Sequence, residues 1–148
     1  MRALGTVYRY WLTIVFLAIV VQVMAAAYGA FYTAEKVDKG VVNEKTFDHG
    51  FGFHTAFGYI IFLGAIILFL LALASRLGKR RVLLALAVPV GVAVQIVLAW
   101  ISEGTHAVGV LHGLTALGLF AFTGYLTGEA WRAARSATAE GSRPVTPE

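Results

Sequence analysis

Long runs of hydrophobic residues alternate with short polar segments along the whole chain. Four runs are each long enough to cross a bilayer as a helix, which needs about 20 apolar residues. They cover residues 8–32, 51–75, 82–101 and 107–131. A helix satisfies its own backbone hydrogen-bonding groups inside lipid, where water is absent. We therefore predict an all-α integral membrane protein with four transmembrane helices in contact with the lipid bilayer.

The polar connections set the arrangement of these helices. The first has about 15–18 residues and the next two have about 6 and 5, and connections this short join antiparallel neighbours. We predict an up-down-up-down bundle formed by one domain, residues 1–134. Residues 135–148 are polar and contain proline, which indicates a disordered tail.

Basic residues are concentrated at one end of the predicted bundle. Nine of the twelve Lys and Arg residues precede the first run, join the second to the third, or follow the fourth. The positive-inside rule places these segments and both termini in the cytoplasm, with the protein in the plasma membrane. Topology thus accounts for the net charge of +4, and no nucleic-acid partner is indicated. The first run exceeds the apolar core of a signal peptide, about 7–15 residues, so we interpret it as a span.

Composition narrows the chemistry. The chain of 148 residues is 59% hydrophobic and only 14% charged, whereas soluble domains carry about a quarter charged residues. It has no cysteine, which excludes disulfides, thiolate metal sites and a cysteine nucleophile. No nucleophile with a matching base and no glycine-rich phosphate loop is recognisable. Hydrolytic catalysis is therefore not predicted, and whether the protein is an enzyme stays open.

The two halves of the chain carry related patterns. In the first and third runs, a glutamine is followed by small residues four and seven positions later. In the second and fourth runs, a histidine is followed by a small residue four positions later, on the same helical face. The matching sets are Gln22, Ala26 and Gly29 with Gln95, Ala99 and Ser102, and His54 and Gly58 with His112 and Ala116. A duplicated helix pair would relate the two histidines by a pseudo-twofold axis along the membrane normal.

The inner histidines, His54 and His112, are the candidate ligands of a cofactor. They lie about one turn inside non-adjacent helices, where polar side chains face the bundle interior. A neutral imidazole is a good iron ligand, so we predict one b-type haem with two histidine ligands near the outer face. Small residues at this level would leave room for the flat porphyrin. These residues are Gly29, Gly58, Ser102, Gly109, Gly113 and Ala116.

Other interpretations of the same residues remain open. Small residues also allow close helix packing without a cofactor, and a histidine near the interface can hydrogen-bond a neighbouring helix. The outer histidines, His49 and His106, are expected to bond haem propionates or to be solvated, and with nearby carboxylates they form an alternative Zn or Cu site. Gln22 and Gln95 lie deeper, as interhelical hydrogen-bonding groups or as contacts of a haem edge or quinone.

The histidine motifs resemble those of known membrane proteins. Residues 51–58 contain an FxxH…G pattern and residues 111–118 an LHGL…G pattern, similar to a family of small four-helix membrane proteins of unknown function. The chain also resembles one four-helix half of haem A synthase, in which histidines on the second and fourth helices ligate haem. Over roughly 8–131, this resemblance implies a haem-holding bundle with His54 and His112 as ligands.

The departures from haem A synthase limit what the resemblance implies. The reactive half of the synthase has a carboxylate three residues before a histidine, and a cysteine pair in the outer loop. Phe51 and Gly109 occupy the corresponding positions here, and the chain lacks cysteine. The resemblance therefore implies the cofactor-holding architecture and not the synthase reaction.

Two classes of function follow from these observations. The first is a cytochrome-b-like protein for electron transfer or haem handling, because two protein ligands leave no open iron position for oxygen chemistry. Its partners would be quinone or a redox partner protein. The alternative is a cofactor-free structural or accessory subunit of a membrane complex, or a homo-oligomer. A histidine proton relay is a third interpretation.

Overall fold

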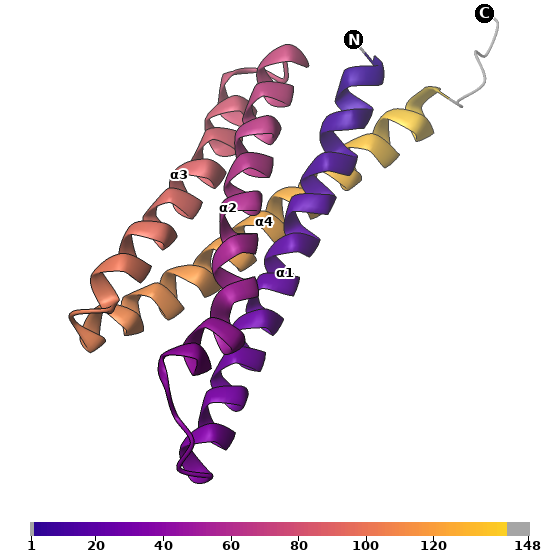
Figure 1. Ribbon diagram of the computed structural model, residues 1–148. Coiled ribbons are helices and arrows are strands. Elements are labelled where there is room, and N and C mark those ends of the chain that lie inside the picture. Colours follow the sequence, from indigo (N-terminus) through magenta and orange to yellow (C-terminus); the bar gives the residue numbers. More distant parts are fainter. Residues whose placement is uncertain (1, 142–148) are drawn as a thin grey trace, which may run out of the picture.

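The computed structural model describes residues 2–141, which form four antiparallel helices joined by short turns (Figure 1). Each helix packs against its neighbours in the chain, and the first packs against the fourth. The second and fourth helices, which carry the inner histidines, are therefore diagonal to each other. The predicted all-α, up-down-up-down bundle is confirmed. The helices are α1 (Arg2–Asp38), α2 (Glu44–Ala74), α3 (Lys79–Ser102) and α4 (His106–Gly141).

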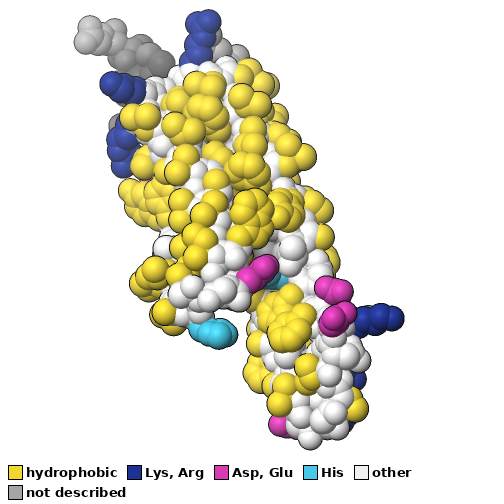
Figure 2. Space-filling model, turned by 60° about the vertical axis from the view of Figure 1, so that its left-hand side comes forward, with side chains coloured by type: hydrophobic (Ala, Val, Ile, Leu, Met, Phe, Trp, Pro, Cys, Tyr) yellow, Lys and Arg dark blue, Asp and Glu magenta, His cyan; other side chains and the backbone are white. Residues whose placement is uncertain are grey.

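The outer surface of the bundle is apolar. All four helices are long and hydrophobic enough to cross a membrane. Figure 2 shows hydrophobic side chains covering most of one face, and large residues such as Phe31 (78% exposed) and Val110 (72% exposed) point outward. A surface this apolar would cause aggregation in water, but in a bilayer it contacts lipid chains. The protein is therefore an integral membrane protein.

The two ends of the bundle differ in charge. One end carries the start of α1, the α2–α3 connection and the last turns of α4, and we call it the terminal end (Figure 1). The other end carries the α1–α2 and α3–α4 connections, and we call it the histidine end. Basic side chains gather at the terminal end, as the sequence predicts. They include Arg9, Arg76, Lys79, Arg80, Arg81, Arg132 and Arg135.

The helices extend beyond the predicted spans. α1 continues to Asp38 and α2 begins at Glu44, so the first connection is only residues 39–43. The additional turns contain alanine, glutamate and lysine, which favour helix in water as well as in lipid. For the same reason, the alanine-rich segment 135–141, predicted to be disordered, continues α4. Residues 142–148 of the predicted tail lie outside the described residues.

The apolar core fills the half of the bundle nearer the terminal end. Leu12, Leu68 and Val88 are completely buried there, on three different helices. The half nearer the histidine end has few buried apolar side chains, and it contains a cavity instead. The other buried hydrophobic residues are Tyr8, Val15, Ile19, Ile61, Ala65, Ala72, Ala85, Val92 and Leu126.

Candidate cofactor site

His54 on α2 and His112 on α4 lie opposite each other across the bundle. Their ring centroids are 6.4 Å apart, the ring planes are inclined at 69°, and both side chains are half-buried. A metal–imidazole bond is about 2 Å long and the ring centroid lies about 1 Å farther out, so two imidazoles opposed on one metal ion have centroids about 6 Å apart. The separation of these two rings fits such a pair.

The same hydrogen bond orients both rings. Nδ1 of His54 lies 3.1 Å from the backbone oxygen of Gln22, and Nδ1 of His112 lies 3.1 Å from the backbone oxygen of Gln95. Because a carbonyl oxygen can only accept, each Nδ1 carries the proton and donates it. Each Nε2 is then left with a free lone pair. A backbone carbonyl fixes metal-binding histidines in this way.

The glutamine side chains contact the same helices as the histidines. Nε2 of Gln22 donates to the backbone oxygen of His54 at 2.7 Å. The orientation of an amide is assigned from its hydrogen-bond network, and the network at Gln95 favours the orientation with its nitrogen 3.1 Å from the backbone oxygen of His112. In this orientation both glutamines make the same bond. The equivalent contacts in the two halves support the duplicated helix pair.

A cavity of about 360 Å³ adjoins the histidine pair, and all four helices line it. Its volume falls within the range of small-molecule and cofactor sites, about 300–1,000 Å³. Among the described lining residues, Glu103 is the only charged one. Polar groups converge at the level of the two histidines and two glutamines, and the remaining walls are largely apolar. The apolar lining includes Ile19, Ile61, Val92, Ile96, Leu117 and Leu119.

The small residues predicted to surround a porphyrin fall into two groups. Gly58, Gly113 and Ala116 line the cavity, and a Cβ added to Gly113 would meet no atom within 4 Å. The other three do not line it and instead occupy helix contacts. These are Gly29, Ser102 and Gly109.

Gly29 allows α1 and α2 to approach closely. A Cβ at this position would lie 2.6 Å from the ring of Phe51 and 2.8 Å from the backbone oxygen of Gly50. At the equivalent contact in the other half, Ser102 and Gly109 bring α3 and α4 together, with a distance of 3.8 Å between the Ser102 Cβ and a Cβ built on Gly109. These three residues therefore pack helices beside the site.

The outer histidines lie away from the cavity. His49 and His106 are exposed at the histidine end, and Nδ1 of His49 contacts the backbone oxygen of Lys45 at 2.7 Å within α2. Within residues 2–141, no group of three His, Asp or Glu side chains is placed to hold a metal ion. The alternative Zn or Cu site thus gains no support, and bonding of these histidines to haem propionates stays a prediction.

Comparison with known proteins assigns no function to this bundle. No protein-family model matches the chain, and neither the curated proteins nor the solved structures give a match. The resemblance to haem A synthase rests on the motif residues alone. Function must accordingly be argued from the geometry of the site.

Proposed function

We propose that the protein is a small membrane b-type cytochrome in which His54 and His112 are the two axial ligands of one haem. The observation that carries this proposal is the 6.4 Å separation of two rings whose Nδ1 atoms both lie 3.1 Å from a backbone carbonyl. That arrangement leaves both Nε2 atoms for iron, and iron is held by imidazole in many haem proteins.

The cavity supplies further support. Its largely apolar walls suit the edge of a macrocycle, while its convergent polar groups lie at the level of the ligands. Bound haem would supply one-electron chemistry. The residues of this chain would orient the ligands through Gln22 and Gln95, and the packed core toward the terminal end would exclude water from that side of the site.

Electron transfer is the activity that two axial ligands favour, because no iron position is left for substrate. The histidines lie toward one end of the bundle, so one haem there cannot carry electrons across the whole bilayer. Its redox partner would be a quinol in the membrane or a protein that docks at the histidine end. The basic terminal end would face the cytoplasm of a plasma membrane, by the positive-inside rule.

A reduced-minus-oxidised visible spectrum of the purified full-length protein tests this proposal, with haem quantified per chain. We expect a low-spin b-type spectrum and one haem per chain. His54→Ala and His112→Ala should each lose haem while still inserting into the membrane. His49→Ala and His106→Ala are the matched controls and should retain it.

Two outcomes would count against the haem proposal. Retention of haem by both inner variants would refute the ligand assignment. Absence of a Soret band after expression with ample haem would favour the cofactor-free accessory subunit instead, and membrane proteins that co-purify with the chain would then identify its complex.

A further inference from the structure

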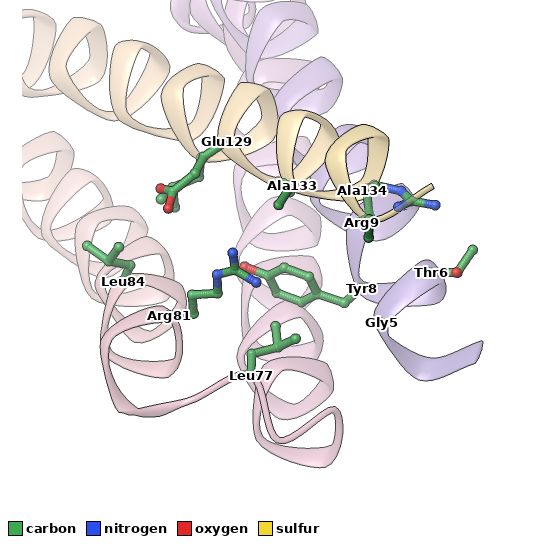
Figure 3. A pocket seen from close by; sticks show the side chains of 13 residues that line it. Gly5, Thr6, Tyr8, Arg9, Leu77, Arg81, Leu84, Glu129, Ala133 and Ala134 are labelled. Atoms are coloured by element: carbon green, nitrogen blue, oxygen red, sulfur yellow. The ribbon is translucent and has the colours of Figure 1, made fainter. Parts of the chain in front are cut away.

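A second and larger cavity, of about 840 Å³, lies at the terminal end. The first turns of α1, the beginning of α3 and the last turns of α4 surround it (Figure 3). Tyr8, Arg81 and Glu129 come from these three helices, and Figure 3 shows the Tyr8 hydroxyl and the Arg81 guanidinium pointing toward each other. The apolar core separates this cavity from the histidines.

The charge of this cavity is positive. Among the described lining residues, Glu129 is the only acidic one, and its carboxylate accepts a hydrogen bond from Arg80 Nη1 at 3.0 Å. The charge of Glu129 is thereby balanced from outside the cavity lining. Arg9 and Arg81 also line the cavity, and neither makes an ion pair with any residue that the structure describes.

Arg9 is held in place with an unsatisfied donor. Its guanidinium lies over the ring of Trp131, 4.6 Å from the centroid, in a cation–π contact. Its Nε is buried and has no hydrogen-bond acceptor among the described residues. Buried N–H groups are almost always paired in native proteins, so an acceptor from outside the chain is expected here.

We propose that this cavity binds the phosphate head group of an anionic phospholipid. Arg9, Arg81 and the hydroxyl of the nearly buried Tyr8 supply donors, and guanidinium groups match phosphate oxygens in bidentate geometry. Apolar side chains complete the lining, as the glycerol and first acyl carbons of a lipid require. A basic pocket between helices at a membrane boundary is the setting in which lipid head groups bind. The apolar lining includes Leu77, Leu84 and Leu126.

This site is independent of the haem proposal, and native mass spectrometry of the full chain tests it. The protein is exchanged into detergent with equal amounts of phosphatidylglycerol and phosphatidylcholine. We expect one phosphatidylglycerol per chain to be retained preferentially. Arg81→Gln should lower that preference about fivefold, the contribution of one basic residue near a lipid head group. Lys79→Gln is the matched control, because it removes a charge from the same connection but does not line the cavity.

The alternatives give different results. Equal retention of the two lipids, or an equal loss in the Lys79→Gln control, would overturn the proposal in favour of diffuse surface charge. Displacement of phosphatidylglycerol by inorganic phosphate at constant ionic strength would also overturn it, by assigning the cavity to a soluble phosphate ester. Arg81 is exposed, so its variant should fold, and Arg81→Lys should keep part of the preference because it keeps the charge but loses the bidentate geometry.

Discussion

The contact of α1 with α2 at Gly29 allows a stability prediction with a defined sign. Replacing Gly29 with alanine adds one carbon where the two helices cross. That carbon would lie 2.6 Å from the Phe51 ring and 2.8 Å from the backbone oxygen of Gly50. The ring can rotate away, but the carbonyl belongs to α2 and moves only if the helices separate. Gly29→Ala should therefore force α1 away from α2.

The magnitude follows from two opposing contributions. Non-bonded carbon contacts are favourable at about 3.5–4.0 Å, so the added carbon overlaps its neighbours substantially. Overpacking of this kind costs about 1–3 kcal/mol. Alanine offsets part of this, because it is better than glycine in a helix by about 0.5–1 kcal/mol. A net loss of about 1–2 kcal/mol in the free energy of unfolding is expected.

Unfolding by SDS titration in mixed micelles, followed by circular dichroism, measures this loss. Gly52→Ala is the matched control, because a Cβ at Gly52 meets nothing within 4 Å, and it should leave the protein as stable or slightly more stable. Equal stability of the two variants would refute the close helix crossing. The folded fraction of Gly29→Ala should bind as much haem as the wild type, since Gly29 does not line the cavity.

Three further predictions test the core and the site. Leu68→Ala empties a completely buried position and should cost about 2–5 kcal/mol in the same titration; a smaller loss would mean that the core collapses around it. Thr123→Val should change stability by less than about 1 kcal/mol, because its hydroxyl bonds only to backbone oxygens of α4, and a larger loss would reveal another partner. Gln22→Leu removes the bond to the His54 backbone and should weaken haem affinity about tenfold, measured by haem transfer to apomyoglobin. Unchanged affinity would make Gln22 a packing residue only.

Most of the fold could be predicted because a bilayer leaves few alternatives for a chain with four long apolar runs. The positions of the helix ends could not. α1 runs to Asp38 and α2 starts at Glu44 because local helix propensity continues past the lipid boundary, which hydrophobicity does not register. The alanine-rich end of α4 is helical for the same reason.

The candidate site was only partly predictable. The depth of His54 and His112 in non-adjacent helices was enough to place them opposite each other. Their orienting partners are backbone carbonyls, and these were missed because every residue has one and the sequence does not distinguish them. Gly29 was grouped with the cofactor site because a small residue that packs a helix looks the same in sequence as one that lines a cavity.

The terminal cavity illustrates the same limit. The sequence explains its basic residues by topology alone. Tyr8, Arg81 and Glu129 lie on three helices, and only the tertiary structure brings them around one cavity.

Imidazole rescue of His112→Gly tests haem ligation by this residue most directly. The substitution removes the ring but keeps the cavity beside it, so added imidazole can enter and take its place. We expect the ferric variant to lose the six-coordinate low-spin spectrum and to regain it when imidazole is added, while a His49→Gly control keeps the wild-type spectrum throughout. A wild-type low-spin spectrum from His112→Gly without imidazole would contradict ligation by His112.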